Sequence, residues 1–313
     1  MRSLLLDLTS AFSNVYSGWI LWNLFLAFIP LVLSFLLFRR KSISQPWLLT
    51  FAGLVGFIGV VGFWSRLPWV MRSQLHMVRD AFSGNLPAQL KLLWFAAIAL
   101  VALGINAWMF RQKANVRTWK WWMVLVIFIA FLPNAPYLLT DIIHLIRATS
   151  SGQIPVWAIA LVFIPLHVVA IVMGFEAYVL SLMNLGYYLK QQGARSLVIS
   201  TELLIHALSA VGIYLGRFIR LNSWDLVVDP SNVFLVTFNT LTDKRPVLVI
   251  VVTFVILTVA YWMMKQITLG LQLRIHCARR GLDPMDVLES APSQTEKTTQ
   301  DTNGMHYLIP QER

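Results

Sequence analysis

The sequence predicts an all-α integral membrane protein, a helical bundle of about seven transmembrane helices. Of its 313 residues, 58% are hydrophobic and only 12% are charged, which is about half the charged fraction of a soluble domain. Apolar runs long enough to cross a bilayer recur along the chain. The lysines and arginines behind the net charge of +11 fall in the gaps between these runs, as membrane topology requires. This distribution argues against nucleic-acid binding.

Seven apolar runs have the length of a membrane crossing, which takes about 20 helical residues. They lie at 19–38, 46–64, 92–110, 121–140, 154–189, 196–216 and 247–264. The fifth run exceeds one crossing but contains no polar turn, so we interpret it as one long or tilted helix. The bundle is predicted to span 19–268, after a short segment at 1–18. A polar tail at 281–313 has a composition typical of disorder.

The first charged cluster sets the expected orientation. Arg39, Arg40 and Lys41 follow the first run directly, and lysine and arginine concentrate on the cytoplasmic side of membrane proteins. Counts along the whole chain lean the same way. We therefore expect a multi-pass protein of the plasma or bacterial inner membrane, surrounded by lipid, with its N-terminus outside and its C-terminus in the cytoplasm.

The second run and the segment after it have two organised faces. Gly53, Gly56, Gly59 and Gly62 recur every three residues, which predicts a groove for close helix packing. Over 67–82 an apolar face opposes a basic one, which predicts a helix lying in the membrane interface.

A polar stripe follows the sixth run. On a helix of 100° per residue, Glu202, His206 and Ser209 share one face, and Arg217 and Arg220 continue it. The stripe either faces neighbouring helices or lines a functional cavity, and the sequence leaves both open. Glu202 and His206 supply two potential metal ligands without a clear third. We predict no metal and no other cofactor.

The fourth run is interrupted near its end. Pro133 and Pro136 each remove a backbone donor, and Asn134 between them is a candidate cap for a new helical turn. Interrupted backbone at membrane depth is tolerated where it is buried in protein or lines a water-filled cavity. Beyond it, Asp141 and His144 are three residues apart and share a helical face.

Depth along the helices brings these groups to one outer rim. Asp141 lies about 31 Å along the fourth run and Arg217 about 33 Å along the sixth, at 1.5 Å per residue. Acids and arginines at one level suit an anionic headgroup or phosphate, and equally suit structural ion pairs. The candidate site residues are Asn134, Tyr137, Asp141, His144, Arg217, Arg220, Asn222, Trp224 and Asp225.

Two segments carry a family resemblance. The first is LPNAPYLLTDIIHL at 132–145 and the second is YLGRFIRLNSWD at 214–225. They resemble the paired signatures of a bacterial membrane family of unknown function, domain of unknown function 1361, over roughly 90–260. The resemblance implies an integral membrane protein and no established activity. It maps onto the candidate site residues, together with Pro136 and Gly216.

Three functional hypotheses follow. In the first, the outer rim binds or transports an anionic ligand such as a lipid phosphate, above a partial water path formed by the polar stripe. In the second, a membrane-embedded enzyme acts on lipid-linked substrates, with His144 or His206 as acid or base. In the third, the protein is a structural or assembly subunit and its charges pair between helices. The sequence identifies no protein partner.

Overall fold

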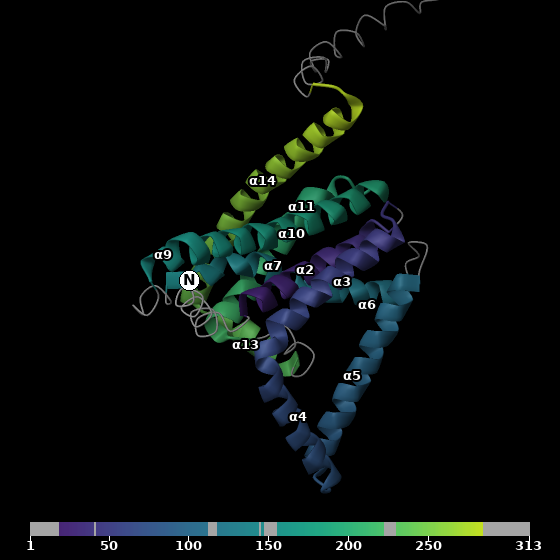
Figure 1. Cartoon of the computed structure of the whole chain (residues 1–313), viewed down its shortest axis with the longest axis vertical. Coiled ribbons are helices and arrows are strands. Elements are labelled where there is room, and N and C mark those ends of the chain that lie inside the picture. Colours follow the sequence, from purple (N-terminus) through teal and green to yellow (C-terminus); the bar gives the residue numbers. More distant parts are fainter. Residues whose placement is uncertain are drawn as a thin grey trace, which may run out of the picture. The chain divides into compact units, whose positions relative to one another are not determined.

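The computed structural model describes residues 19–40, 42–111, 118–143, 145–146, 155–221 and 230–283. All regular elements in these ranges are helices (Figure 1), which confirms the predicted all-α class. Six helical stretches are long and apolar enough to cross a membrane, and the protein is a multi-pass membrane protein. These stretches are Trp19–Phe38, Gln45–Phe82, Trp119–Asp141, Val156–Gln191, Leu197–Ile219 and Lys244–Arg280.

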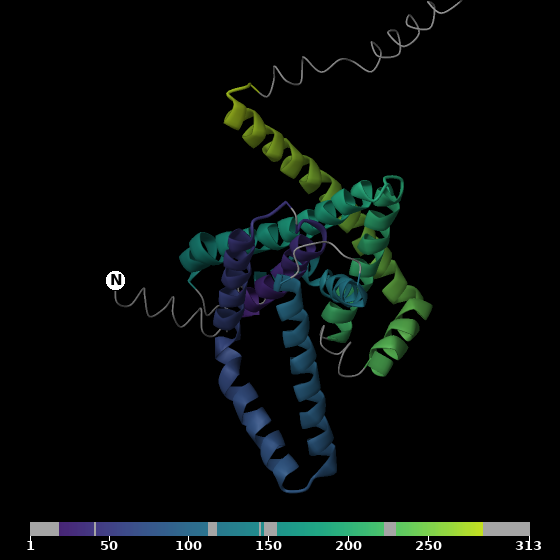
Figure 2. The ribbon, with the colours of Figure 1, turned by 90° about the vertical axis from the view of Figure 1, so that its right-hand side faces the viewer.

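The predicted third span, 92–110, lies inside α5 (Leu86–Arg111), which is outside these six stretches. Helix α4 (Leu67–Phe82) packs against α5 as a hairpin (Figure 2), and Gly84 takes a left-handed φ of 91° at the turn. Helix α3 (Gln45–Phe63) leads into α4 through the short 3₁₀ turn η2 (Trp64–Arg66). The segment expected in the membrane interface is therefore helical, as predicted, and its position relative to the bilayer stays a prediction.

Helix α2 (Trp19–Phe38) is the central element of the bundle, with more than half of its residues buried. It packs against α3, α6 (Trp119–Phe131), α7 (Asn134–Tyr137) and α10 (Ile164–Gln191). This placement follows from an apolar sequence all around the helix, which is typical of a helix without a solvent face.

The glycines of α3 allow it to approach α2 closely along part of their length. A Cβ at Gly59 would lie 2.7 Å from the Phe25 ring, and a Cβ at Gly62 would meet the backbone of Trp22. Gly53 and Gly56 have nothing within 4 Å of a Cβ position. The predicted close packing therefore forms at Gly59 and Gly62 only, because the first half of α3 contacts α2 through its aromatic rings instead of its glycines.

The long fifth run is one continuous helical stretch, as predicted. It begins with α9 (Val156–Ala158), passes through the π-helical turn η4 (Ile159–Phe163) and continues as α10. His167, only 2% exposed, has its Nδ1 2.8 Å from the carbonyl oxygen of Phe163. Its ring also packs on Trp19, so this histidine is an internal packing residue.

The sixth run forms α11 (Leu197–Tyr214) and then a second π-helical turn, η5 (Leu215–Ile219). After Leu221 the next described helices are α13 (Pro230–Thr242) and α14 (Lys244–Arg280). Contacts divide the chain into two compact units between Tyr261 and Trp262. The first unit contains the bundle and the candidate site. The described part of the second is the remainder of α14 and a few residues after it, up to Asp283, and most of the predicted tail lies outside the described residues.

Candidate functional site

The fourth span is broken where its prolines predict. Helix α6 ends at Phe131, α7 is a single turn, and the 3₁₀ turn η3 (Leu138–Asp141) completes the span. The cap position of α7 is Pro133 and no side chain caps it, so the expected capping role of Asn134 is wrong. The N–H of Ala135 donates to Leu132, which leaves the Phe131 carbonyl without its usual helical donor, and the Asn134 amide donates to that carbonyl at 2.9 Å. The side chain thus repairs the break from inside the turn.

Asp141 is the buried centre of the site. Its Oδ1 accepts a hydrogen bond from Nη2 of Arg217 at 2.6 Å, and its Oδ2 accepts one from the Asn23 amide at 2.8 Å. The residue is 0% exposed, so both carboxylate oxygens are used within the protein. The depth calculation correctly placed Asp141 and Arg217 together, and Asn23 on α2 joins them.

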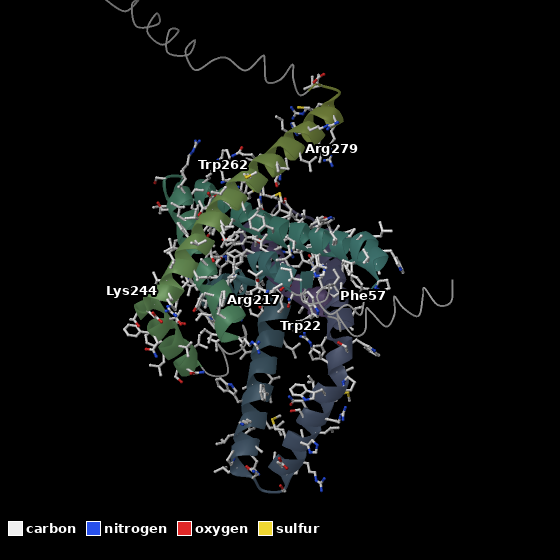
Figure 3. The ribbon with its side chains drawn as sticks, turned by 90° about the vertical axis from the view of Figure 1, so that its left-hand side faces the viewer. Trp22, Phe57, Arg217, Lys244, Trp262 and Arg279 are labelled. Carbon is white, nitrogen blue, oxygen red and sulfur yellow. The ribbon has the colours of Figure 1, made fainter. Side chains whose placement is uncertain are left out.

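Arg217 is held by three further contacts. Its Nε and Nη2 donate to the Thr140 hydroxyl at 2.9 and 2.6 Å, and that hydroxyl donates to the Tyr137 carbonyl at 2.6 Å. Its Cζ lies 4.3 Å from the centroid of the Tyr137 ring, within the range of a cation–π interaction. Arg217 lies where the end of α11 meets the other helices of the bundle (Figure 3). The guanidinium is therefore fixed on one face and one edge.

Two glycines bring α11 against the broken segment. A Cβ at Gly212 would lie 2.8 Å from the ring of Pro133, and a Cβ at Gly216 would lie 3.1 Å from the ring of Tyr137. Larger residues would push the two spans apart. The second motif therefore needs glycine at 216 so that the neighbouring arginine can reach Asp141.

The rest of the predicted rim is only partly described. Arg220 is exposed and takes a left-handed φ of 65°, directly after the π-helical turn. This turn departs from the straight-helix geometry from which the stripe was extended, so the alignment of Arg217 and Arg220 with Glu202 stays a prediction. The remaining candidates, His144, Asn222, Trp224 and Asp225, lie outside the described residues.

A second polar cluster is buried between α10, α11 and α14. The Tyr178 hydroxyl lies 2.7 Å from Nδ1 of His206 and 3.3 Å from Oγ of Ser209, and all three residues are at most 1% exposed. The Tyr261 hydroxyl donates to Glu202 at 2.7 Å, and its ring packs on His206 with centroids 4.7 Å apart. The stripe thus faces α10 and α14 and finds hydrogen-bonding partners there. In the described part of the chain, no three histidine, cysteine, aspartate or glutamate side chains gather as they would around a metal.

Sequence reasoning missed four of these residues: Asn23, Thr140, Tyr178 and Tyr261. Asn23 carried a usable signal, because it is the single amide side chain in the apolar run 19–38 and polar groups in spans usually face protein. The two tyrosines carried no such signal, since tyrosine occurs both inside helical bundles and at membrane surfaces.

Comparison with known proteins identifies the family. Neither the search of curated proteins nor the search of solved structures gave a match. The family described as "Protein of unknown function (DUF1361)" matches residues 94–259, which is more than half of the chain and includes both motifs. This multi-pass membrane protein therefore belongs to the family of unknown function DUF1361.

Proposed function

We propose that this membrane protein binds, and in a transport role would pass on, an anionic group such as a lipid phosphate at the rim formed by Tyr137, Thr140, Asp141, Arg217 and Arg220. We call this the Arg217 rim. One observation carries the proposal: two arginines end the same helix, one fixed by four contacts and the next exposed. Oriented guanidinium groups are the usual protein partners of phosphate.

In this proposal Asp141 is a positioning residue. Its two oxygens already bind Arg217 and Asn23, so it holds the guanidinium rather than contacting the ligand. Arg220 supplies a charge that no carboxylate among the described rim residues offsets, since Asp141 pairs with Arg217. Asn134 supports the turn beneath, and His144, Asn222, Trp224 and Asp225 stay proposed members of the rim from sequence. We place the rim on the outer face, with the N-terminus outside.

The structural-subunit hypothesis is the second candidate, and the complete use of Asp141 favours it. A buried ion pair in which both carboxylate oxygens accept hydrogen bonds is also what a purely structural contact between helices requires. The closed cluster of Tyr178, His206 and Ser209 points the same way, because hydrogen-bonded partners replace the water path that the stripe suggested. The enzyme hypothesis rests on His144 or on the buried His206, and no observation in the described residues favours it.

Lipid retention tests the proposal. Native mass spectrometry of the full chain in mild detergent would compare binding of phosphatidylglycerol and phosphatidylcholine to wild type, Arg220→Gln and a control. The control is Arg195→Gln, which removes an exposed arginine from the turn between α10 and α11. We expect Arg220→Gln to weaken phosphatidylglycerol retention about tenfold, because a charge-assisted hydrogen bond is lost. Equal retention in Arg220→Gln and Arg195→Gln would contradict binding at this rim and leave the structural role.

A further inference from the structure

A second arginine, Arg39, is held in position at the C-terminal end of α2, whereas Asn23 of the first site lies near its N-terminal end. Arg39 follows the last residue of α2, and its Nε donates to Oδ1 of Asn184 on α10 at 3.1 Å. Its Cζ lies 3.6 Å from the centroid of the Tyr187 ring. Asn184, 6% exposed, is itself fixed by donating to Ser34 at 3.0 Å. The guanidinium is therefore stacked on one face and bonded at Nε.

The charge of Arg39 differs from that of Arg217 in having no acid beside it. Within the described ranges no carboxylate pairs with Arg39, and its Nη1 and Nη2 have no partner. A guanidinium has five N–H donors, so four donors on the two Nη atoms remain for a ligand. An arginine whose two contact partners are neutral and whose Nη groups are open can take an anion in a two-pronged hydrogen bond.

A buried donor without a described partner belongs to Trp121, whose ring packs on residues next in the chain to Arg39 and Tyr187. Trp121 on α6 is 6% exposed, and its Nε1–H has no acceptor among the described residues. Its ring packs on Phe38 and Tyr188, with centroids 6.4 and 5.7 Å apart. Phe38 directly precedes Arg39, and Tyr188 directly follows Tyr187. The hydroxyl of Thr118, one turn earlier, is also buried without a partner in the described part.

Unpaired buried donors are unusual in native proteins and call for a ligand or ion. Leaving one unsatisfied costs about 1–3 kcal/mol. The two orphaned groups and the open edge of Arg39 come from two helices, α2 and α6, that meet at this end of the bundle. One extended polar ligand with several acceptor oxygens would satisfy them together.

We propose that Arg39 and Trp121 form a binding site for the phosphate-bearing headgroup of an anionic phospholipid. Helix α2 is about 30 Å long at 1.5 Å per residue, the thickness of the hydrocarbon core, so Arg39 lies at headgroup level. The phosphate accepts from the Nη groups of Arg39, and a phosphate or ester oxygen accepts from Nε1 of Trp121. This site lies at the opposite end of α2 from Asn23 and does not depend on the Arg217 rim.

The test measures phosphatidylglycerol and phosphatidylcholine retention by the full chain in native mass spectrometry. The variants are Arg39→Gln and Trp121→Phe, and the control is Arg195→Gln, an exposed arginine in the turn between α10 and α11. We expect Arg39→Gln to weaken phosphatidylglycerol retention about tenfold and Trp121→Phe to weaken it severalfold. Arg195→Gln should match wild type.

Trp121→Phe separates ligand loss from damage to the fold. It keeps an aromatic ring against Phe38 and Tyr188 and removes a donor that has no partner among the described residues, so any loss of thermal stability in lipid-free detergent should reflect only the smaller ring. Wild-type retention in both Arg39→Gln and Trp121→Phe would overturn the site, as would an equal loss in Arg195→Gln. Displacement of the bound lipid by excess inorganic phosphate would overturn the lipid as its source and assign a soluble phosphate.

Discussion

A carboxylate inside a membrane protein is stable only if neighbouring atoms offset its charge. For Asp141 this is done by one cation and one neutral amide, from helices far apart in the sequence. Thr140 next to it provides the second anchor of the same arginine. The role of the first motif is therefore to position the Arg217 guanidinium. The ligand-binding and structural-subunit hypotheses differ in whether that guanidinium also contacts a ligand.

Replacing Asp141 by Asn should show how much the pair contributes to stability. Removing one member of a buried pair leaves an uncompensated charge and costs about 3–5 kcal/mol. We expect Asp141→Asn to lower the free energy of SDS-induced unfolding by an amount of this order, and Arg217→Met added to it to recover part of the loss. Asp80→Asn on the exposed face of α4 is the control. Unchanged unfolding in Asp141→Asn would mean that the pair does not stabilise the fold.

Replacing Arg220 should separate stability from binding. Its left-handed φ of 65° costs a non-glycine residue about 1–2 kcal/mol, so Arg220→Gly should stabilise the protein by about 1 kcal/mol. Arg220→Ala keeps the Cβ and should give no such gain. Both variants should lose phosphatidylglycerol retention in the proposed rim. If both variants retain phosphatidylglycerol and still differ in stability, Arg220 affects only the backbone conformation and does not bind the lipid.

At the scale of helices, close approach and irregular turns decide which polar groups meet. The sequence predicted the broken fourth span, the single long fifth stretch and the polar face of the sixth run. It did not predict the π-helical turn at Leu215–Ile219, because periodicity assumes 3.6 residues per turn, and such turns are frequent at functional sites. Arg217 lies in that turn and pairs with Asp141, and Arg220 follows the turn with a left-handed φ.

The glycine face of α3 offers a test of helix packing. A Cβ at Gly62 meets the backbone of Trp22, which cannot move as a side chain end could, whereas Gly53 faces open space. We expect Gly62→Ala to destabilise the protein by about 1–3 kcal/mol through overpacking. Gly53→Ala should be neutral or slightly stabilising, since alanine favours helix over glycine. Thermal unfolding in detergent compares the two, and equal midpoints would contradict the packing of α3 on α2.

At the scale of the whole molecule, composition and the length of the apolar runs predicted the all-α class and the multi-pass character, and the two motifs predicted the family. It left open which helices are neighbours, and this is why Asn23, Tyr178 and Tyr261 were missed. Asn23 and Arg39 lie about 24 Å apart along α2 at 1.5 Å per residue. We therefore expect the two proposed arginine sites to lie at opposite membrane surfaces.

The single cysteine of the chain makes the orientation measurable. In a Cys277→Ser background, Ser44→Cys and Arg195→Cys place thiols in the turns after α2 and after α10. We expect a membrane-impermeant maleimide to label both from the cytoplasmic side and Ser83→Cys, in the turn of the α4–α5 hairpin, from the outside. Labelling of Ser44→Cys in intact cells would reverse the predicted orientation.

The Asn23–Asp141 hydrogen bond has a consequence in time. During synthesis Asp141 leaves the ribosome 118 residues after Asn23 and 76 residues before Arg217. At a synthesis rate of about 5–20 residues per second, Arg217 is added roughly 4–15 s after Asp141. The amide of Asn23 is synthesised before Asp141, so it is available to the carboxylate earlier than Arg217 is. Loss of Asn23 should therefore delay or divert insertion of the nascent chain before it alters the finished protein.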